Sequence, residues 1–486
     1  MNNRGVGDMT SQENGKRSYP VNKYLEGNYA PVSGEHVVEF EDMEVLGEVP
    51  QDLDGVYVRN GPNNQHPALG NYHRYDGDGM LHGVRFKDGR ATYRNKWIHT
   101  TCFDEEAAAG EALWGGMLDA RRGDRPDMPL KDTANTDVVM HAGKLVATWY
   151  ISGDPYLVDP ITLESLGQSD FGGKRTTKIS AHSKTDESTD DFIFFDYSRD
   201  YPYMNHGVID KNGAMTAFTP VELPGPRLPH DMWISHSYTI LHDLPLIYDE
   251  EAYAHGRVKL RFEEDWPTRF GVLPRHGTGD DIRWYEFAPC YILHTINAWE
   301  NGDWLHMTGC RIQPHTDGQG NPDLQSIITI MGRHGLDARL YRWSINLLTG
   351  ETKESLLDDK WNAEFPTWNN SAMGEPMKYA YCAQIRHEPV INFPGLMKFD
   401  LDNGVSEVHS AGPGYTYSEA PFAPAVGATG EDHGYVVSFV RNAEAGQSEV
   451  HIIDAQNFSA PPVCKLILPH RVPEGFHATW ARGDLL

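Results

Sequence analysis

Short runs of β-branched and aromatic residues recur along most of the chain, each bounded by residues that favour turns. Clear examples are GVYVRNGP at 55–62, DFIFFDYS at 191–198 and GYVVSFVRN at 434–442. Other runs are joined in pairs by KDGR, HAGK, LTGE and LDNG, which are typical of the tight turns in β-hairpins. The pattern therefore predicts a chain built mainly from β-strands.

Helical periodicity is rare by comparison. The best helix candidate is FDEEAAAGEALWGGML at 103–118, and NPDLQSIITI at 321–330 is ambiguous. An all-β chain with so many strands must close on itself or stack, because open strand edges invite aggregation, and this favours a propeller or a large barrel. Four strands per blade would give about six to eight blades. No WD or kelch-type repeat is visible that would set the number.

The hydrophobic pattern also predicts the domain organisation. Residues 1–30 are rich in Gly, Ser, Asn and charged residues, so we expect a flexible polar lead-in. Residues 31–486 are expected to form a single β-propeller domain. Although the chain is about three times as long as a typical domain, all-β barrels and propellers often run large as one unit.

Charge narrows the classes of partner. The chain has 42 Lys and Arg residues against 69 Asp and Glu residues, a formal net charge of −27. Such an excess of negative charge repels phosphate backbones, so nucleic acid is not expected as a partner. No stretch approaches the roughly 20 apolar residues that span a bilayer, and the N-terminus lacks the apolar core of a signal peptide. We expect no transmembrane segment, while a transient contact with a membrane surface stays open.

The five cysteines are scattered, without a CxxC pair that could hold zinc or support redox chemistry. An odd number of separated cysteines is typical of a reduced compartment. The sequence thus favours a cytoplasmic protein.

The chain contains 23 histidines, and most are expected to be surface, turn or core residues. No HxH, HExxH or HxxxH pair with a suitable carboxylate is present, so the compact zinc hydrolase motifs are absent. A metal site would have to be assembled from distant segments, and the inner strands of a propeller can do this because they all face one axis. Histidines near strand ends in apolar surroundings are the best candidates: His182, His230, His294 and His477.

The segments that carry these histidines are KISAHSKTD, LPGPRLPHDMWIS, CYILHTINAW and RVPEGFHATW. In this order they resemble the four metal-binding segments of the carotenoid cleavage oxygenase family. The resemblance extends to VYVRNGPN, HRYDGDGMLHGVRF, NAWENGD, AEFPTWN and SEAPFAP, and it covers the chain from about residue 35 onward. It implies a seven-bladed β-propeller, with a dome of loops and short helices over an axial ferrous iron (Fe²⁺) that the four histidines bind.

The resemblance also implies residues that support the ligands. Glu364 is expected to accept a hydrogen bond from His294, and Glu419 from His477. Where the family usually has a third glutamate, behind His230, this chain has Tyr150. A phenol oxygen is a weaker acceptor than a carboxylate, so either iron affinity falls or Asp154 or a water substitutes. Thr136 matches a residue that in some members crowds the open coordination position.

The implied reaction inserts O2 across a C=C bond of a small hydrophobic alkene and yields two carbonyl products. Family tunnels are lined with aromatic residues, and for each candidate core packing is the alternative. The candidates are Phe103, Trp149, Trp284 and Phe365, with Tyr150 beside them.

Substrate choice depends on Trp149. Family members that cleave lignostilbene and isoeugenol resemble one another in a lysine at this position, which holds the phenolic oxygen of the substrate. Tryptophan carries no charge, which favours an apocarotenoid-like polyene. Cleavage of phenylpropanoid or stilbenoid alkenes is the alternative. A further alternative is an oxygen-independent isomerase or hydrolase, or a non-catalytic propeller.

Overall fold

The computed structural model describes residues 22–119, 121–254, 259–312, 315–316, 322–323, 337–386 and 391–486. Residues 1–21 of the predicted lead-in lie outside this part, as does the ambiguous run at 321–330 apart from a two-residue strand. Residues 22–30 form two short turns whose backbone is held from the other end of the chain. Arg471 donates hydrogen bonds to the carbonyls of Asn28 and Ala30, and the backbone N–H of Glu474 donates to that of Asn28.

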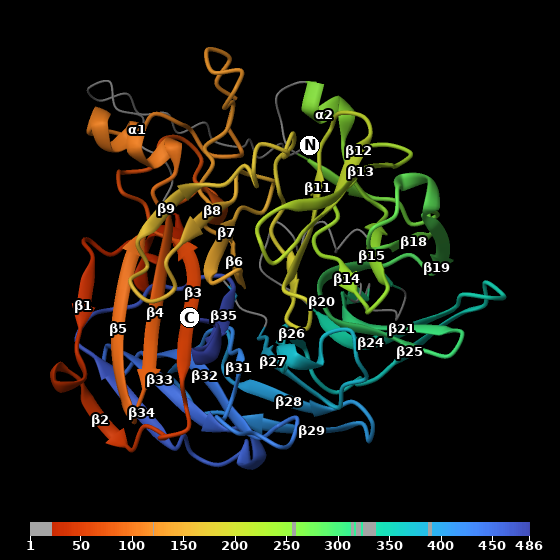
Figure 1. Cartoon of the computed structure of the whole chain (residues 1–486). Coiled ribbons are helices and arrows are strands. Elements are labelled where there is room, and N and C mark those ends of the chain that lie inside the picture. The colour runs from red at the N-terminus through yellow and green to blue at the C-terminus, as the bar shows by residue number, and fades with distance from the viewer. Residues whose placement is uncertain are drawn as a thin grey trace, which may run out of the picture.

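Seven large antiparallel sheets surround one axis, in chain order (Figure 1), and the predicted seven-bladed β-propeller is confirmed. The first three blades have the following strands. Blade 1 contains β1 (His36–Val38), β3 (Gly55–Pro62), β4 (Gly79–Lys87), β5 (Arg90–Trp97) and β35 (Ala478–Arg482). Blade 2 contains β6 (Asp137–His141), β7 (Lys144–Thr148), β8 (Tyr156–Val158) and β9 (Ser165–Gln168). Blade 3 contains β10 (Lys184–Asp186), β11 (Asp191–Tyr197), β12 (Tyr203–Ile209) and β13 (Met215–Glu222).

The other four blades complete the ring. Blade 4 contains β14 (Trp233–Ile234), β15 (Tyr238–Asp243), β18 (Thr268–Pro274) and β19 (Arg283–Phe287). Blade 5 contains β20 (Tyr291–Asn301), β21 (Trp304–Ile312), β24 (Ala338–Asn346) and β25 (Thr352–Leu356). Blade 6 contains β26 (Ala363–Thr367), β27 (Tyr379–Gln384), β28 (Leu396–Asp400) and β29 (Val405–His409). Blade 7 contains β2 (Glu44–Gly47), β30 (Tyr415–Tyr417), β31 (Phe422–Pro424), β32 (Gly434–Asn442), β33 (Gln447–Asp454) and β34 (Cys464–Leu468).

The remaining elements are short. Two small hairpins pair β16 (Leu246–Tyr248) with β17 (Leu260–Phe262) and β22 (His315–Thr316) with β23 (Pro322–Asp323). The α-helices are α1 (Thr101–Ala109) and α2 (Glu250–Ala254). The 3-10 helices are η1 (Lys23–Leu25), η2 (Gly27–Tyr29), η3 (Phe40–Asp42), η4 (Arg74–Asp76), η5 (Gly279–Asp281), η6 (Asn370–Ala372), η7 (Ala455–Asn457) and η8 (Gly483–Leu485).

Burial differs systematically between inner and outer strands. The strand β20 is buried over its first nine residues, because neighbouring blades and the axis cover both of its faces. The outer strand β25 is mostly exposed, and β13 alternates between buried and exposed residues. Between blades 4 and 5, Trp233 packs against Trp343 with ring centroids 5.6 Å apart, and both side chains are fully buried.

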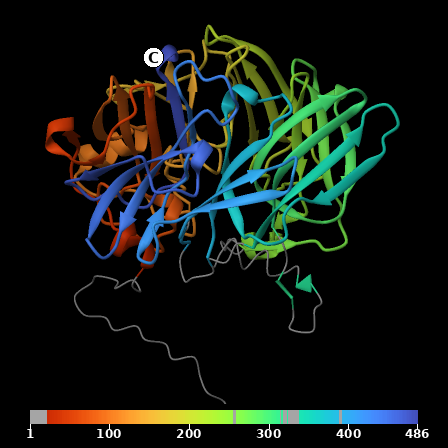
Figure 2. The ribbon, with the colours of Figure 1, turned by 90° about the horizontal axis from the view of Figure 1, so that it is seen from below.

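Two strand pairings between distant parts of the chain close the ring. In blade 1, β35 pairs with β3 from Gly55 opposite Arg482 to Arg59 opposite Ala478. In blade 7, β2 pairs with the outer strand β34. The C-terminus therefore lies on one face of the ring of blades (Figure 2), close to the axis.

The predicted helix at 103–118 is only half helical. Thr100 caps the N-terminus of α1 by accepting a hydrogen bond from the backbone of Phe103, and Gly110 ends the helix in the left-handed conformation with φ 74°. The rest of the run packs, as a loop, against the connection between β3 and β4: Gly115 forms a β-bridge with Leu69, and the backbone N–H of Met117 donates to Asp76 at 2.8 Å. Among the described residues, no helix is long and apolar enough to cross a bilayer, and all five cysteines are buried and unpaired.

Candidate metal centre

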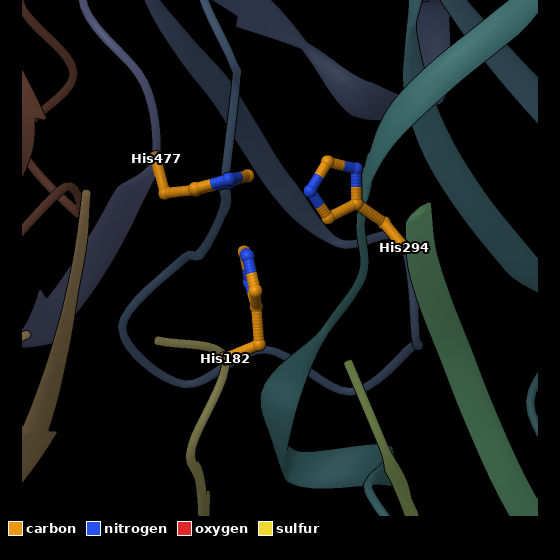
Figure 3. A group of neighbouring side chains, drawn as sticks. All are labelled: His182, His294 and His477. Carbon is orange, nitrogen blue, oxygen red and sulfur yellow. The ribbon is translucent and has the colours of Figure 1, made fainter. Parts of the chain in front are cut away.

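Four histidines from four blades converge on the axis. His182 precedes β10, His230 precedes β14, His294 lies within β20 and His477 directly precedes β35. Ligand nitrogens of His182, His294 and His477 all lie within 4.8 Å of one another (Figure 3). His230 completes the group from one side, since its Nε2 lies 3.2 Å from Nε2 of His294 and its ring centroid 4.6 Å from that of His182.

The cluster fits a metal ion by its electrostatics. All four rings are buried, and burial lowers the pKa of His182, His230 and His294 well below the ordinary value for histidine. Neutral imidazoles present lone pairs to a shared centre. The Nε2 atom of His182 is buried without a hydrogen-bond partner in the described structure. Buried polar atoms rarely lack partners, and a metal ion would satisfy this one.

Glu364 and Glu419 hold two of the rings from behind. The carboxylate of Glu364 accepts a hydrogen bond from Nδ1 of His294 and another, 3.3 Å long, from the backbone N–H of the same residue. Glu419 accepts from Nδ1 of His477 at 3.1 Å and from the backbone N–H of Ala478. Each glutamate therefore fixes both a ring and the adjacent backbone, which leaves Nε2 as the free nitrogen.

Burial shifts the pKa values of both glutamates and of the histidines that they contact. Burial raises the pKa of Glu364 to about 8, and it also raises the pKa of Glu419. Burial lowers the pKa of His477, but the carboxylates of Glu419, Asp137 and Asp231 together raise it more, so the net shift is upward. His477 is thus the one ligand candidate whose charged form the protein itself stabilises.

Backbone strain occurs at two residues of the centre. His182 has φ 66° and Phe365 has φ 53°, the left-handed region that costs a branched or bulky residue energy. The backbone N–H of His182 donates to Oδ2 of Asp137 at 2.9 Å, which holds the turn in place. The Phe365 ring stacks on His477 with centroids 5.1 Å apart and lies 4.9 Å from that of His294.

Tyr150 contacts His230 but does not bond to its ring nitrogen. The two ring centroids are 5.1 Å apart, while Nδ1 of His230 has no hydrogen-bond partner in the described part of the chain. Burial raises the pKa of the Tyr150 phenol well above its usual value, so the phenol stays neutral. Asp154, the suggested substitute acceptor, is paired with Arg175 at 2.8 Å and with Lys178, and is therefore occupied elsewhere.

Thr136 lies beside His477. Its carbonyl accepts a hydrogen bond from the backbone N–H of His477 at 3.2 Å. Its hydroxyl donates to Oδ1 of Asn135 and accepts from the backbone N–H of Tyr150, both at 3.0 Å. Thr136 therefore links the Tyr150 segment to the His477 segment.

The predicted tunnel residues separate into two groups. Phe365 contacts the histidines, and Trp149 donates a hydrogen bond from Nε1 to the carbonyl of Tyr75 at 3.2 Å. Phe103 lies on α1 and packs against Trp97 and His99. Trp284 lies on β19, the outermost strand of blade 4, under the guanidinium of Arg269. The structure does not bring Phe103 or Trp284 to the cluster, because residue type does not say which strand of a blade a side chain occupies.

The sequence did not predict two features of the site: a stack of aromatic rings and a cavity. Tyr75 stacks on Tyr150 and on Phe476, both at 4.7 Å between centroids. On the face where the C-terminus lies, a cavity of about 490 Å³ reaches the histidines. Inner strands line it with a mixture of apolar and polar side chains, among them Lys184 and Asp231. Asp231 directly follows His230 in the sequence, and that adjacency was a signal that could have identified it.

Comparison with known proteins gives consistent matches over nearly the whole chain. The family model described as retinal pigment epithelial membrane protein (RPE65) matches residues 29–482. Carotenoid 9,10(9',10')-cleavage dioxygenase 1 of Pisum sativum is 34% identical over 501 residues, covering 95% of this chain and 90% of the relative. Isoeugenol monooxygenase of Pseudomonas nitroreducens is 28% identical, covering 90% and 94%. The crystal structure of Pseudomonas brassicacearum lignostilbene dioxygenase superposes with a TM-score of 0.83 at 24% identity, covering 96% and 100%.

Proposed function

The chain belongs to the RPE65 and carotenoid cleavage oxygenase family and cleaves a conjugated alkene with O2, and we propose that this alkene is an apocarotenoid-like polyene. The proposed metal is ferrous iron. The proposed ligands are His182, His230, His294 and His477. The observation that supports this most directly is the buried group of four imidazoles on the axis, two of them backed by carboxylates.

The iron, the glutamates and the aromatic residues have different roles in the proposed reaction. When bound, ferrous iron supplies the redox centre at which O2 is activated, and the overall reaction breaks one C=C bond and puts one oxygen atom on each carbonyl product. Glu364 and Glu419 orient the rings of His294 and His477. The aromatic group of Tyr75, Tyr150 and Phe365 supplies flat faces beside the cluster. No protein group has to transfer a proton, because the products differ from the reactants only by O2.

Four observations favour a polyene over a phenolic alkene. Trp149 stands where a lysine would hold a phenolic oxygen, and its Nε1 already donates to a backbone carbonyl. No described Lys or Arg forms a ring or hydrogen-bond contact with the four histidines. The relative that is 34% identical is named as a carotenoid cleavage dioxygenase. Flat, stacked aromatic side chains suit a long conjugated hydrocarbon.

Cleavage of a phenylpropanoid alkene is the second candidate. It is supported by the 28% identical isoeugenol monooxygenase, whose match covers 90% of the present chain. Both candidates use the same cleavage chemistry, so they differ only in how the site holds the ends of the substrate. A cytoplasmic location, with transient membrane contact to collect a polyene, is part of the first proposal. Its support is the set of five buried free cysteines, which suits a reduced compartment.

The test uses protein purified without a histidine tag, loaded with ferrous iron and desalted. We expect about one iron per chain by mass spectrometry, and cleavage of an apocarotenal to two carbonyl fragments in air but not under nitrogen. A 4-hydroxystilbene serves as the competing substrate, and an apocarotenal analogue with saturated bonds as the control. Oxygen-dependent cleavage of the stilbene alone would establish the second candidate. Turnover without O2, or negligible iron, would overturn the proposal.

A further inference from the structure

Asp231 joins three of the four histidine segments through one buried carboxylate. Its Oδ2 accepts hydrogen bonds from both the backbone N–H and the hydroxyl of Thr295, each 2.8 Å long, and Thr295 directly follows His294. Its Oδ1 lies 2.7 Å from Nζ of Lys184, which is two residues beyond His182. Asp231 itself directly follows His230, and its side chain is 1% exposed.

These contacts lie next to the histidine that has the least support. Nδ1 of His294 and Nδ1 of His477 each donate to a glutamate, whereas Nδ1 of His230 has no partner in the described structure. We propose that Asp231 is a positioning residue, which fixes the His230 segment against the His182 and His294 segments in place of an acceptor on the His230 ring. This inference rests on the four-histidine site of the proposed function.

The physical reason is the strength and number of the contacts. Hydrogen bonds to a carboxylate are shorter and stronger than those between neutral groups, and Asp231 makes them in two directions. Its Oδ1 also accepts from the backbone N–H of Met232 at 2.7 Å, which fixes the carboxylate to the segment that leads into β14. The hydroxyl of Thr295 lies 2.9 Å from the Met232 carbonyl, so this segment and β20 are joined at two residues. Movement of the His230 backbone would break several of these bonds at once.

The substitution Asp231→Asn removes the charge and keeps the shape. An amide nitrogen would face either the N–H of Thr295 or the ammonium of Lys184, so one of the two connections must fail. The matched control is Asp78→Asn. Asp78 is also a buried carboxylate held by a lysine and a backbone N–H: it lies 2.6 Å from Nζ of Lys131 and accepts from the backbone N–H of Gln65 at 2.9 Å. Neither partner belongs to a histidine segment.

The experiment uses cobalt(II) as a probe, because its visible absorption reports coordination number and geometry. We expect Asp231→Asn to weaken cobalt affinity at least about tenfold, by chelator competition, and to alter the intensity of the visible bands. Asp78→Asn is expected to lower the Tm of the metal-free protein and leave affinity and spectrum at wild-type values. If Asp231→Asn does the same, Asp231 has a structural role only and the inference is wrong.

Two further measurements keep the outcomes separate. Should Asp231→Asn fail to fold, Thr295→Val removes the hydroxyl contacts with Asp231 and with the Met232 carbonyl and keeps the backbone bond to Asp231. A loss of about threefold or more in cobalt affinity is expected from it, and wild-type affinity in that variant would overturn the inference. Wild-type protein that does not bind cobalt would remove the proposed metal site itself. Wild-type protein that binds cobalt beside unaffected variants would remove only the role of Asp231.

Discussion

The four histidines form two pairs that the protein holds in different ways. His294 and His477 each donate from Nδ1 to a buried glutamate of a neighbouring blade. Among the described residues, His182 and His230 have no such partner: the nearest carboxylate oxygen to Nδ1 of His182, on Asp137, is 3.9 Å away, and Nδ1 of His230 has no hydrogen-bond partner. In the first pair the ring itself is anchored, whereas in the second the backbone beside the ring is anchored.

The difference shows two routes to the same preorganisation. A carboxylate on the ring fixes its tautomer and its orientation together. A bond to the backbone beside a histidine fixes the position of its Cα but leaves the ring free to rotate. The ring is then held in one orientation only if the backbone is strained or makes several contacts. His182 has the left-handed backbone and the Asp137 bond, and His230 has the neighbouring Asp231. The ring-anchored pair should therefore depend on single residues more strongly than the backbone-anchored pair.

The largest effect is expected from removing a ring-anchored ligand. His294→Ala and His477→Ala should each abolish stable iron retention, since the ion would lose a neutral ligand and the site would open to water. Metal content after loading and desalting measures this. His242→Ala is the matched control, because His242 is also buried but packs on Trp233 and lies outside the cluster. About one iron per chain in either ligand variant would contradict the assignment.

A smaller effect is expected from the anchors themselves. Glu364→Gln and Glu419→Gln should weaken metal affinity about 10- to 100-fold, the usual cost of losing a partner behind a ligand. Competition with a chelator of known affinity measures the change. Glu106→Gln, which alters a buried glutamate paired with Lys131, should leave affinity unchanged. Equal affinities in all three variants would mean that the ring anchors do not contribute.

Converting a backbone-anchored ligand into a ring-anchored one sharpens the comparison. Tyr150→Glu would place a carboxylate beside His230, whose Nδ1 lacks an acceptor. We expect unchanged affinity or a gain of up to about tenfold, measured by the same competition. A collapse of metal content in this variant would show instead that the Tyr150 ring, stacked on Tyr75, is itself required.

The smallest effect is expected from Tyr150→Phe. The phenol oxygen is not bonded to Nδ1 of His230, so removing it should change metal affinity by less than about twofold. The ring stack with Tyr75 would be kept. A loss of metal affinity comparable with that of Glu364→Gln would show that Tyr150 anchors the His230 ring. His230 would then not differ from His294 and His477 in how it is held.

The hydrophobic pattern was sufficient to predict the strands, but it was not sufficient to predict how many blades they form. GVYVRNGP coincides with β3, all eight residues of which are buried. The blade count could not follow from local pattern, since blade 1 takes its inner strand from the other end of the chain and no repeat marks the blades. Gly110 could have been identified as the end of α1, because glycine is the residue that adopts the left-handed cap most readily.

The sequence predicted the site residues that lie in recognisable motifs, but it did not predict those that loops bring to the site. The four histidines stand in separate motif segments, and the structure brings all four together. Tyr75 and Phe476 lie outside the sheets, so only tertiary packing places them at Tyr150. Phe103 and Trp284 were chosen by residue type, and this criterion does not distinguish an axial strand from an outer one.

The pairing of β35 with β3 has a consequence for synthesis. Blade 1 begins with strands that leave the ribosome early, yet its inner strand is made after all the others. His477 directly precedes that strand, so the proposed set of ligands is completed in the same step that closes the ring. A chain whose synthesis stops short therefore lacks both features together. In the cell, tight retention of metal would report that translation and ring closure have both finished.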